Sequence, residues 1–222
     1  MHYIIGVGGG GSHLVWPLAK IEGKSSITLV DGDTLERKNL DRQKFDEADL
    51  GFNKARAMAI KFPGMLFIPE YYHAGSFRLN RSDVLWCCAD NHACRKQVLE
   101  ACDMYRCRAV IGANEYTDAE AYWYEPNWKD TPNDPRVVYP VILTDDTNDP
   151  LRPEGCVEAS QRHPQLVLAN MLSADMMLWL WHFHTKERPK LELTAETAKF
   201  LPCHHTATMW KLGTIRAGDE RT

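Results

Sequence analysis

The sequence predicts an α/β fold with a doubly wound, mostly parallel sheet that continues into antiparallel strands, and with helices on both faces. Short apolar runs alternate with stretches of helical spacing along the first 115 residues, a pattern typical of successive strand–helix–strand units. The first two apolar runs end in Gly6-Val7-Gly8-Gly9-Gly10-Gly11 and in Asp31-Gly32-Asp33, turns that suit the ends of buried parallel strands. Ligands of such a sheet bind beyond the carboxyl ends of its strands.

The individual elements follow from these runs in chain order. Apolar runs predict parallel strands at 3–7, 26–30, 65–69, 83–88 and 108–113. Alternating apolar residues predict an antiparallel strand at 121–125, and a short strand is expected at 137–141. Apolar residues at helical spacing predict helices at 12–21, 51–62, 92–104 and 164–184. Pro17 lies inside the first of these helices and is expected to kink or shorten it.

Composition excludes several classes of protein. Hydrophobic residues make up 44% of the chain and charged residues 25%, which is ordinary for a globular domain with a sizeable core. The formal charge of -4 argues against a general nucleic-acid binder. No stretch reaches the roughly 20 apolar residues of a membrane-spanning helix, and the start does not resemble a secretory signal. The seven irregularly spaced cysteines predict reduced thiols and therefore a cytoplasmic protein.

The glycine-rich turn has glycines at the three positions of a dinucleotide-binding fingerprint. Glycines permit a tight turn and let phosphate approach backbone N–H groups at a helix N-terminus, where the partial positive charge favours anions. Asp31 ends the second predicted strand, where its carboxylate can accept hydrogen bonds from ribose hydroxyls. Together these features predict a nucleotide site and leave open whether the nucleotide is ATP or NAD. A turn that only joins a strand to a helix is the structural alternative.

Three further segments complete a set that resembles the ThiF/MoeB/ubiquitin-activating enzyme superfamily. They are Asn39-Leu40-Asp41-Arg42-Gln43, Gly51-Phe52-Asn53-Lys54-Ala55, and Ala89-Asp90-Asn91 followed by Arg95. All occur in the order of the family's motifs. The resemblance implies one Rossmann-like adenylation domain over residues 1–222. Its nucleotide-binding half is expected at 1–115. The second half, at 116–222, is expected to contain antiparallel strands, a mobile loop at 127–162, a helix that packs on the sheet, and a tail.

The resemblance also implies that the chain uses ATP and Mg²⁺. It places Arg42 and Lys54 on the triphosphate, Asp31 on the ribose and Asp90 on Mg²⁺, a cation that takes one or two carboxylates beside phosphate oxygens. Cations suit this chemistry because charge builds up on the phosphoryl oxygens when a carboxylate attacks the α-phosphate. The other residues placed near the nucleotide are Gly6, Gly8, Gly9, Gly11, Asp33, Asn39 and Gln43.

Each of these residues also has an ordinary structural interpretation. Arg42 and Lys54, taken singly, could be surface charges, and Asp31 and Asp33 could be turn residues. The joint order and spacing favour the functional interpretation for Arg42, Lys54, Asp31 and Asp90, and less so for Arg95 and Gln43.

The cysteines are interpreted separately. Cys156 precedes the last apolar helix and resembles a family cysteine that forms a sulfur-linked intermediate in some relatives. A thiolate attacks an acyl adenylate readily, so Cys156 is the candidate nucleophile, with an ordinary loop thiol as the alternative. The segment Cys203-His204-His205 lacks a second pair of ligands, which argues against a metal site. Core packing is expected of the remaining cysteines, Cys87, Cys88, Cys94, Cys102 and Cys107.

The chain departs from the family pattern in two respects. It has no pair of Cys-x-x-Cys motifs, so no structural zinc is predicted. Its first strand begins beside Met1, so the arginine that N-terminal helices of many relatives supply to the partner's ATP site would have to come from elsewhere. Relatives pair through surfaces near the ATP site, and a homodimer is therefore expected.

The leading hypothesis is adenylation of the C-terminal carboxylate of a ubiquitin-like or sulfur-carrier protein that ends in glycine, with acyl transfer to Cys156 as a further step. One alternative is another carboxylate, on a peptide precursor or a modified tRNA base, although the acidic composition argues against tRNA. Another is a non-catalytic partner subunit, against which the presence of Arg42, Lys54 and Asp90 argues. NAD-dependent redox chemistry is disfavoured, since hydride transfer needs no such cations around the phosphates.

Overall fold

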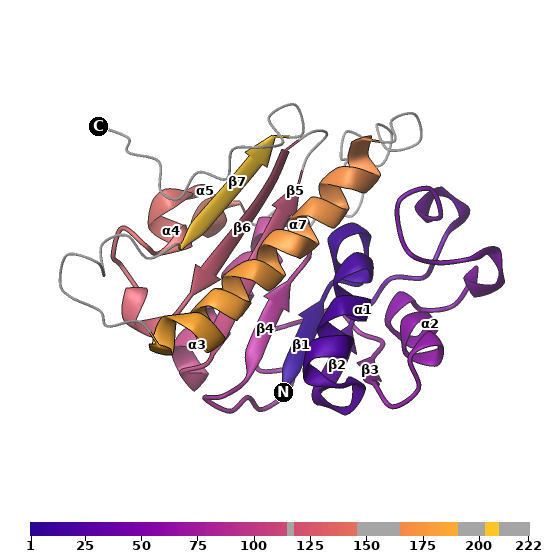
Figure 1. The fold of residues 1–222 in the computed structure, drawn as a ribbon, viewed down its shortest axis with the longest axis horizontal. Coiled ribbons are helices and arrows are strands. Elements are labelled where there is room, and N and C mark those ends of the chain that lie inside the picture. The colour runs from indigo at the N-terminus through magenta and orange to yellow at the C-terminus, as the bar shows by residue number, and fades with distance from the viewer. Residues whose placement is uncertain (115–117, 146–164, 191–202, 209–222) are drawn as a thin grey trace.

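The computed structural model describes residues 1–114, 118–145, 165–190 and 203–208. These residues form one sheet of seven strands in the order β3-β2-β1-β4-β5-β6-β7 (Figure 1). The strands are β1 (His2–Ile5), β2 (Ile27–Val30), β3 (Leu66–Ile68), β4 (Val84–Cys87), β5 (Arg108–Asn114), β6 (Asp118–Tyr124) and β7 (His204–Thr208).

The first five strands are parallel, and β6 and β7 continue the sheet in antiparallel fashion. The predicted doubly wound, mostly parallel sheet is thereby confirmed. From the central β1 the chain builds outward through β2 and β3 on one side and through β4 and β5 on the other. The strand order therefore reverses between β1 and β4, and this switch point is where open α/β sheets bind their ligands.

Helices cover both faces of the sheet. The helices are α1 (Gly9–Glu22), α2 (Lys54–Lys61), α3 (His92–Tyr105), α4 (Pro135–Val138), α5 (Val141–Thr144) and α7 (Gln165–His182). Short 3-10 turns lie at Lys24–Ser26, Arg37–Asn39, Glu47–Asp49, Pro126–Trp128 and Arg188–Lys190, and a π turn lies at Phe183–Glu187. Right-handed crossovers place α1 and α3 on opposite faces, because the chain leaves β1 and β4 in opposite directions.

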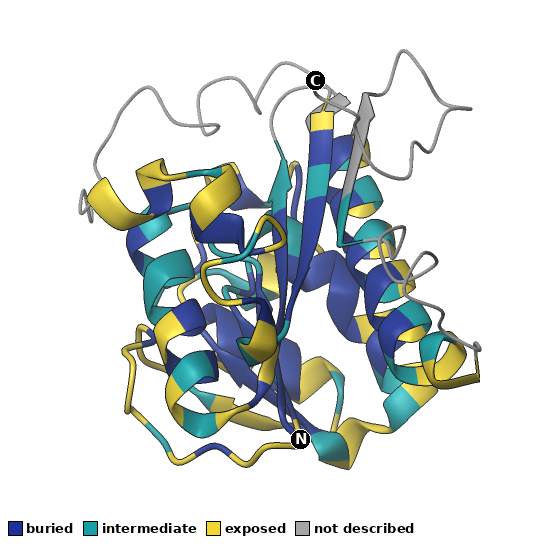
Figure 2. Cartoon of the chain, turned by 90° about the vertical axis from the view of Figure 1, so that its left-hand side faces the viewer, coloured by how far each residue is buried: buried dark blue, intermediate teal, exposed yellow. Residues whose placement is uncertain are grey.

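The core lies between these layers, as Figure 2 shows by the buried strands between helices. Ile4, Leu29, Leu85 and Val110 on neighbouring strands have no exposed surface, which explains why the parallel strands are apolar without alternation. The long helix α7 crosses the sheet diagonally beside α1 and contacts β5 and β6 (Figure 1). Gly112 of β5 allows this contact, since a Cβ there would lie 2.4 Å from the Met177 sulfur of α7.

One prediction about secondary structure is wrong, and a second, the kinking or shortening of the first helix at Pro17, is wrong as to the shortening. Residues 137–141 do not form a strand but belong to the helical turns α4 and α5. Asp134 accepts a hydrogen bond from the Arg136 N–H as an N-cap, and Pro135 takes the first helical position, so a helix begins where the apolar side chains indicated a strand. The first helix is not shortened at Pro17 but continues to Glu22.

The described part of the predicted loop at 127–162 ends at residue 145 and contains α4 and α5. Among the helices of the described residues, none has the length and hydrophobicity needed to cross a bilayer.

Candidate functional site

The glycine-rich turn joins β1 to α1 at the switch point of the sheet. Gly6 has a φ of +86°, a left-handed conformation that glycine adopts without strain. A Cβ on Gly6 would lie 2.9 Å from the backbone nitrogen of Ala89, which follows β4. A Cβ on Gly11 would lie 1.9 Å from the Gly6 carbonyl oxygen. Both glycines are therefore required for three backbone segments to meet here.

The N-terminus of α1 is open on one side. The helix begins at Gly9, and Gly8 is its N-cap residue. A Cβ on Gly10 would meet no atom of the described residues within 4 Å. The first N–H groups of a helix carry a partial positive charge and have no partner within the helix. An anion can therefore approach the backbone at this point.

Two carboxylates follow β2 in different surroundings. Asp31 is only 8% exposed, and its two oxygens accept the N–H groups of Val7, at 2.6 Å, and of Asp33, at 2.8 Å. Burial raises the pKa of Asp31, although Lys54 and these N–H donors act against the rise. The bond to Val7 ties the end of β2 to the glycine turn, so Asp31 has a structural role whether or not it also binds a ligand.

Asp33 is the more exposed carboxylate, with 45% of its side chain accessible. It accepts hydrogen bonds from Lys54 Nζ at 2.8 Å and from the Tyr71 hydroxyl at 2.5 Å. Burial alone would raise the pKa of Asp33, but the hydrogen bonds from Lys54 and Tyr71 outweigh burial and lower it. The same bond to Asp33 raises the pKa of Tyr71 to about 12.

Lys54 is held beside these carboxylates by the start of α2. Asn53 is the N-cap of the helix and accepts the Arg56 N–H at 3.0 Å. Its Nδ2 donates to the carbonyl oxygens of Asp31, at 2.7 Å, and of Asp33, at 3.1 Å. Lys54 itself is 7% exposed, so its ammonium group stays close to Asp33. Hydrogen bonds from Asn53 and Lys54 thus connect the start of α2 to the residues that follow β2.

The segment from Asn39 to Gln43 packs against the glycine turn and α1. Asn39 is buried, and its Oδ1 accepts the Glu36 N–H at 2.9 Å. Arg42 is also buried and donates through Nη1 to the Lys38 carbonyl at 2.9 Å. Gln43 lies with Nε2 3.7 Å from the position of a Cβ on Gly8. Its Oε1 is buried and has no hydrogen-bond partner among the described residues.

Asp90 lies on the opposite side of the turn. It is exposed and follows Ala89, the residue that the turn contacts at Gly6. Asn91 is the N-cap of α3 and accepts the Cys94 N–H at 2.8 Å, which fixes the backbone next to Asp90. The structure thus brings Arg42, Lys54, Asp31 and Asp33 to the β2 side of the glycine turn and Asp90 to the β4 side.

Other predicted residues lie elsewhere or outside the described chain. Arg95 of α3 is half-buried, with Nη1 3.4 Å from His92 Nδ1. Cys156 lies outside the described residues. Within the described segments, no group of three or more His, Cys, Asp or Glu side chains could hold a metal ion. As predicted, Cys87, Cys88, Cys94, Cys102 and Cys107 lie in the core or pack against it.

Two residues of the site were not predicted from the sequence. Tyr71 follows β3 closely, and its position after a parallel strand is a signal that could have indicated it. Asn170 lies on α7, where its carboxamide contacts Gly9. An asparagine in a long apolar helix gives no comparable signal. A surface hollow of about 220 Å³ between α1 and α2 is lined by none of the site residues described above; its lining is Ser12, Trp16, Lys44, Met58, Lys61 and Phe62.

Comparison with known proteins identifies the first part of this arrangement. Residues 2–65 match the ThiF family. This stretch runs from β1 to the end of α2 and holds the glycine turn, both carboxylates after β2, Arg42 and Lys54. This match supports the assignment of the chain to the ThiF/MoeB-like superfamily.

The fold of the chain matches 165 chains of solved structures. One is a crystal structure of selenomethionine PaaA, with 14% sequence identity and a TM-score of 0.59. The match covers 99% of this chain and 71% of PaaA. At this identity the likeness shows the fold alone. No curated protein matches the chain.

Proposed function

We propose that this chain adenylates the C-terminal carboxylate of a ubiquitin-like or sulfur-carrier protein that ends in glycine. The match of residues 2–65 to the ThiF family suggests an adenylyltransferase. The observation that carries the proposal is the pairing of Lys54 with Asp33 beside an open helix N-terminus at the switch point of the sheet. Such a place suits the phosphates of a nucleotide.

The residues present fit ATP. Open space at Gly10 lets phosphate reach the start of α1, and Arg42 and Lys54 supply positive charge on the β2 side. Gln43 Oε1 and Asn170 Nδ2 are buried polar atoms without a hydrogen-bond partner in the described part of the chain. Buried groups of this kind are uncommon in native proteins unless a ligand or water satisfies them. The fit therefore rests on shape, charge and unsatisfied hydrogen-bonding capacity together.

Each residue has a defined task in the proposed reaction. Arg42 and Lys54 neutralise the charge that develops on the phosphoryl oxygens as the carboxylate attacks the α-phosphate and pyrophosphate leaves. Asp33 keeps the Lys54 ammonium in place before ATP binds. Asp31 holds the glycine turn, and each of its oxygens keeps a second lone pair for a ribose hydroxyl. Asp90 would hold Mg²⁺, whose charge assists the departure of pyrophosphate.

Three further statements belong to the proposal. Cys156 accepts the acyl group from the adenylate to give a thioester. The protein is a homodimer, as expected from the family. It works in the cytoplasm, in keeping with the six described cysteines, all of which are free thiols.

The proposal is tested by exchange of labelled pyrophosphate into ATP in the presence of glycine-ended carrier proteins. Wild type should catalyse carrier-dependent exchange. Asp90→Ala should lower the exchange rate by about 100-fold or more while the far-UV circular dichroism stays unchanged, since the exposed Asp90 side chain has no place in the core. ATP binding without exchange for any such carrier would contradict the proposed substrate. A wild type that binds no ATP would favour a non-catalytic subunit.

Cys156→Ala separates adenylation from acyl transfer. It should keep pyrophosphate exchange and lose the thioester, which is seen as a reductant-sensitive band on a non-reducing gel. Cys203→Ala is the matched control, because Cys203 is a half-buried cysteine to which the proposed reaction assigns no role. Loss of exchange together with the thioester would show that the two roles cannot be separated in this way.

A further inference from the structure

Asn170 is a buried polar residue on α7, a helix made mostly of apolar residues. It is 3% exposed. A Cβ on Gly9, the first residue of α1, would lie 2.3 Å from Asn170 Oδ1, 2.7 Å from Cγ and 2.8 Å from Nδ2. The carboxamide therefore lies directly against the backbone at the start of α1, and it can do so only because residue 9 has no side chain.

The Nδ2 group of Asn170 is unsatisfied. It is buried and has no hydrogen-bond partner within the described segments. An unpaired buried donor destabilises the folded state, so a hydrophobic residue would stabilise the free protein better at this position. The buried donor suggests that another molecule satisfies it.

A second carboxamide faces the same turn from the other side. Gln43 is 7% exposed, its Nε2 lies near Gly8, and its Oε1 is also buried without a partner among the described residues. Asn170 at Gly9 and Gln43 at Gly8 thus flank the N-terminus of a 14-residue helix. A donor group beside the positive end of a helix is suited to an anionic oxygen.

We propose that Asn170 is a further nucleotide-binding residue, whose carboxamide donates through Nδ2 to a phosphate oxygen held at the N-terminus of α1. The inference rests on the proposed function. It makes α7 one wall of the phosphate site. The site therefore includes a residue from the second half of the chain, far beyond the residues that match the family.

The first test measures ATP binding by isothermal titration calorimetry together with thermal unfolding. Asn170→Ala should weaken ATP binding about tenfold, the effect of one hydrogen bond to a charged group. Asn170→Asp has the same size but replaces the donor with a carboxylate that repels phosphate, and should weaken binding further. Ser173→Ala is the control, because Ser173 is buried on the same helix but faces Gly112 of β5. Its ATP affinity should equal that of wild type.

The second test examines the contact with Gly9. Gly9→Ala should reduce ATP affinity and thermal stability more in wild type than in Asn170→Ala, because the added methyl group collides with the carboxamide only where the carboxamide is present. Equal losses in both backgrounds would place the side chain away from the turn and overturn the proposal.

Failure of this inference can be distinguished from failure of the proposed function. If wild type binds ATP and Lys54→Met does not, while both Asn170 variants bind as tightly as wild type, only the role of Asn170 is overturned. If wild type binds no ATP, the proposed function fails, and the role of Asn170 fails with it.

Discussion

The two carboxylates after β2 show how neighbouring residues of one type acquire different tasks. Asp31 directly follows the strand, and its carboxylate accepts the backbone N–H of Val7 in the glycine turn and the backbone N–H of Asp33. Asp33, two residues later, has left the strand and meets only side chains, Lys54 and Tyr71. The first carboxylate therefore shapes the turn, and the second sets the position of a cation.

Tyr71 is expected to influence nucleotide binding through Asp33. Its ring covers Gly32, where a Cβ would lie 2.6 Å from ring atoms, and its hydroxyl donates to Asp33. Tyr71→Phe keeps the ring and removes the donor, which leaves Asp33 and Lys54 less fixed. We expect ATP affinity to fall about fivefold, the effect of about 1 kcal/mol.

The fold should tolerate this change, because Tyr71 is 58% exposed and exposed substitutions usually shift stability by less than about 0.5 kcal/mol. Tyr105→Phe on α3 is the matched control and should leave ATP affinity unchanged. Calorimetry with ATP decides the matter: equal affinity of Tyr71→Phe and wild type would show that the hydroxyl plays no part in binding.

The roles of single residues were harder to predict than the elements that carry them. The parallel strands were predicted because buried strands of a sheet covered on both faces are apolar without interruption. Residues 137–141 look like such a strand, yet Asp134 and Pro135 begin a helix there, and local capping outweighs the apolar pattern. The motif residues were predicted by resemblance, whereas Asn170 depends on how α7 crosses α1, which no local pattern encodes.

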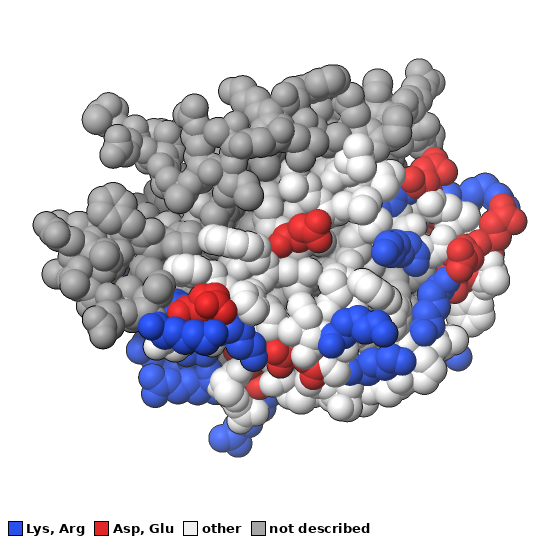
Figure 3. Space-filling view, in the orientation of Figure 1, with Lys and Arg blue, Asp and Glu red and all other residues white. Residues whose placement is uncertain are grey.

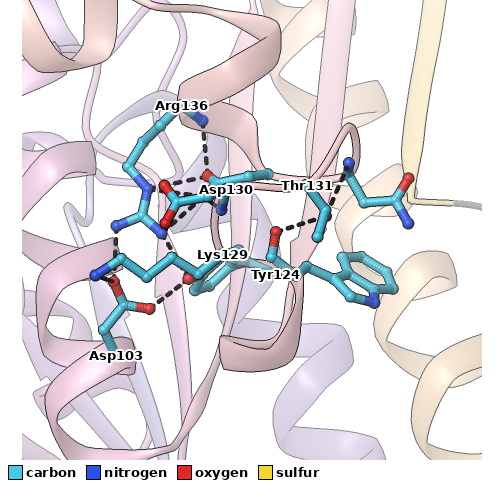
Figure 4. A network of polar contacts seen from close by, with 9 residues as sticks. Asp103, Tyr124, Lys129, Asp130, Thr131 and Arg136 are labelled. Carbon is cyan, nitrogen blue, oxygen red and sulfur yellow. Dashed lines mark hydrogen bonds and ion pairs between the residues drawn. The ribbon is translucent and has the colours of Figure 1, made fainter.

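At the scale of elements, one polar network connects α4, in the segment after β6, to α3 and to the end of β6. Arg136 of α4 donates to Asp134 at 2.9 Å, to Asp103 of α3 at 2.8 Å and to the Tyr124 hydroxyl of β6 at 2.6 Å (Figure 4). Asp134 has no exposed surface and Arg136 is 8% exposed. Tyr124 pairs with Ala109 at the start of β5, so this network lies at the sheet edge opposite the glycine turn.

Arg136→Met should destabilise the protein strongly, because it leaves the buried Asp134 carboxylate without its cation. Removing one partner of a buried pair typically lowers the free energy of unfolding by about 3–5 kcal/mol, measurable by urea denaturation. Lys129→Met is the control. Lys129 also pairs with Asp103, but its side chain is 53% exposed, and the expected loss is about 0–1 kcal/mol. Equal losses in the two variants would contradict a structural role for the buried arginine.

The same network predicts a pH dependence. Burial acts to raise the pKa of Asp103, but hydrogen bonds from Arg136 and Tyr124 outweigh it and lower the pKa below the ordinary value of 3.8. Stability from this carboxylate is therefore fully present above its unfolded pKa and is lost as pH falls through the folded pKa. The urea midpoints of wild type and Arg136→Met should lie closer together at about pH 3 than near pH 7. A constant difference across this range would contradict the contribution of Asp103.

At the scale of the whole molecule, the outer face of α7 has no cover among the described residues. The exposed fractions of Leu168, Met171 and Trp179 are 50%, 42% and 47%. They are three and eight residues apart, so they share one side of the helix, which also carries the exposed Asp175. Figure 3 shows this face with an acidic side chain in its centre and most of its Lys and Arg along the lower and right-hand margins. Large apolar side chains exposed together on one helix face often mark a protein–protein interface, so this face suits the proposed homodimer.

The double variant Leu168→Glu with Met171→Glu should convert the dimer to a monomer, because it replaces two apolar side chains of the proposed interface with carboxylates beside the exposed Asp175. Multi-angle light scattering should give about twice 25.4 kDa for wild type and about 25.4 kDa for the variant. Met104→Glu is the control, since Met104 is 66% exposed on α3 across the sheet, and this variant should remain dimeric. Circular dichroism should be unchanged throughout, because these side chains are largely exposed. A monomeric wild type, or a dimeric double variant, would show that α7 does not form the interface.

Because α7 also carries Asn170, a dimer through its outer face would hold the wall of the proposed phosphate site in place, and the monomeric variant should then bind ATP more weakly than wild type.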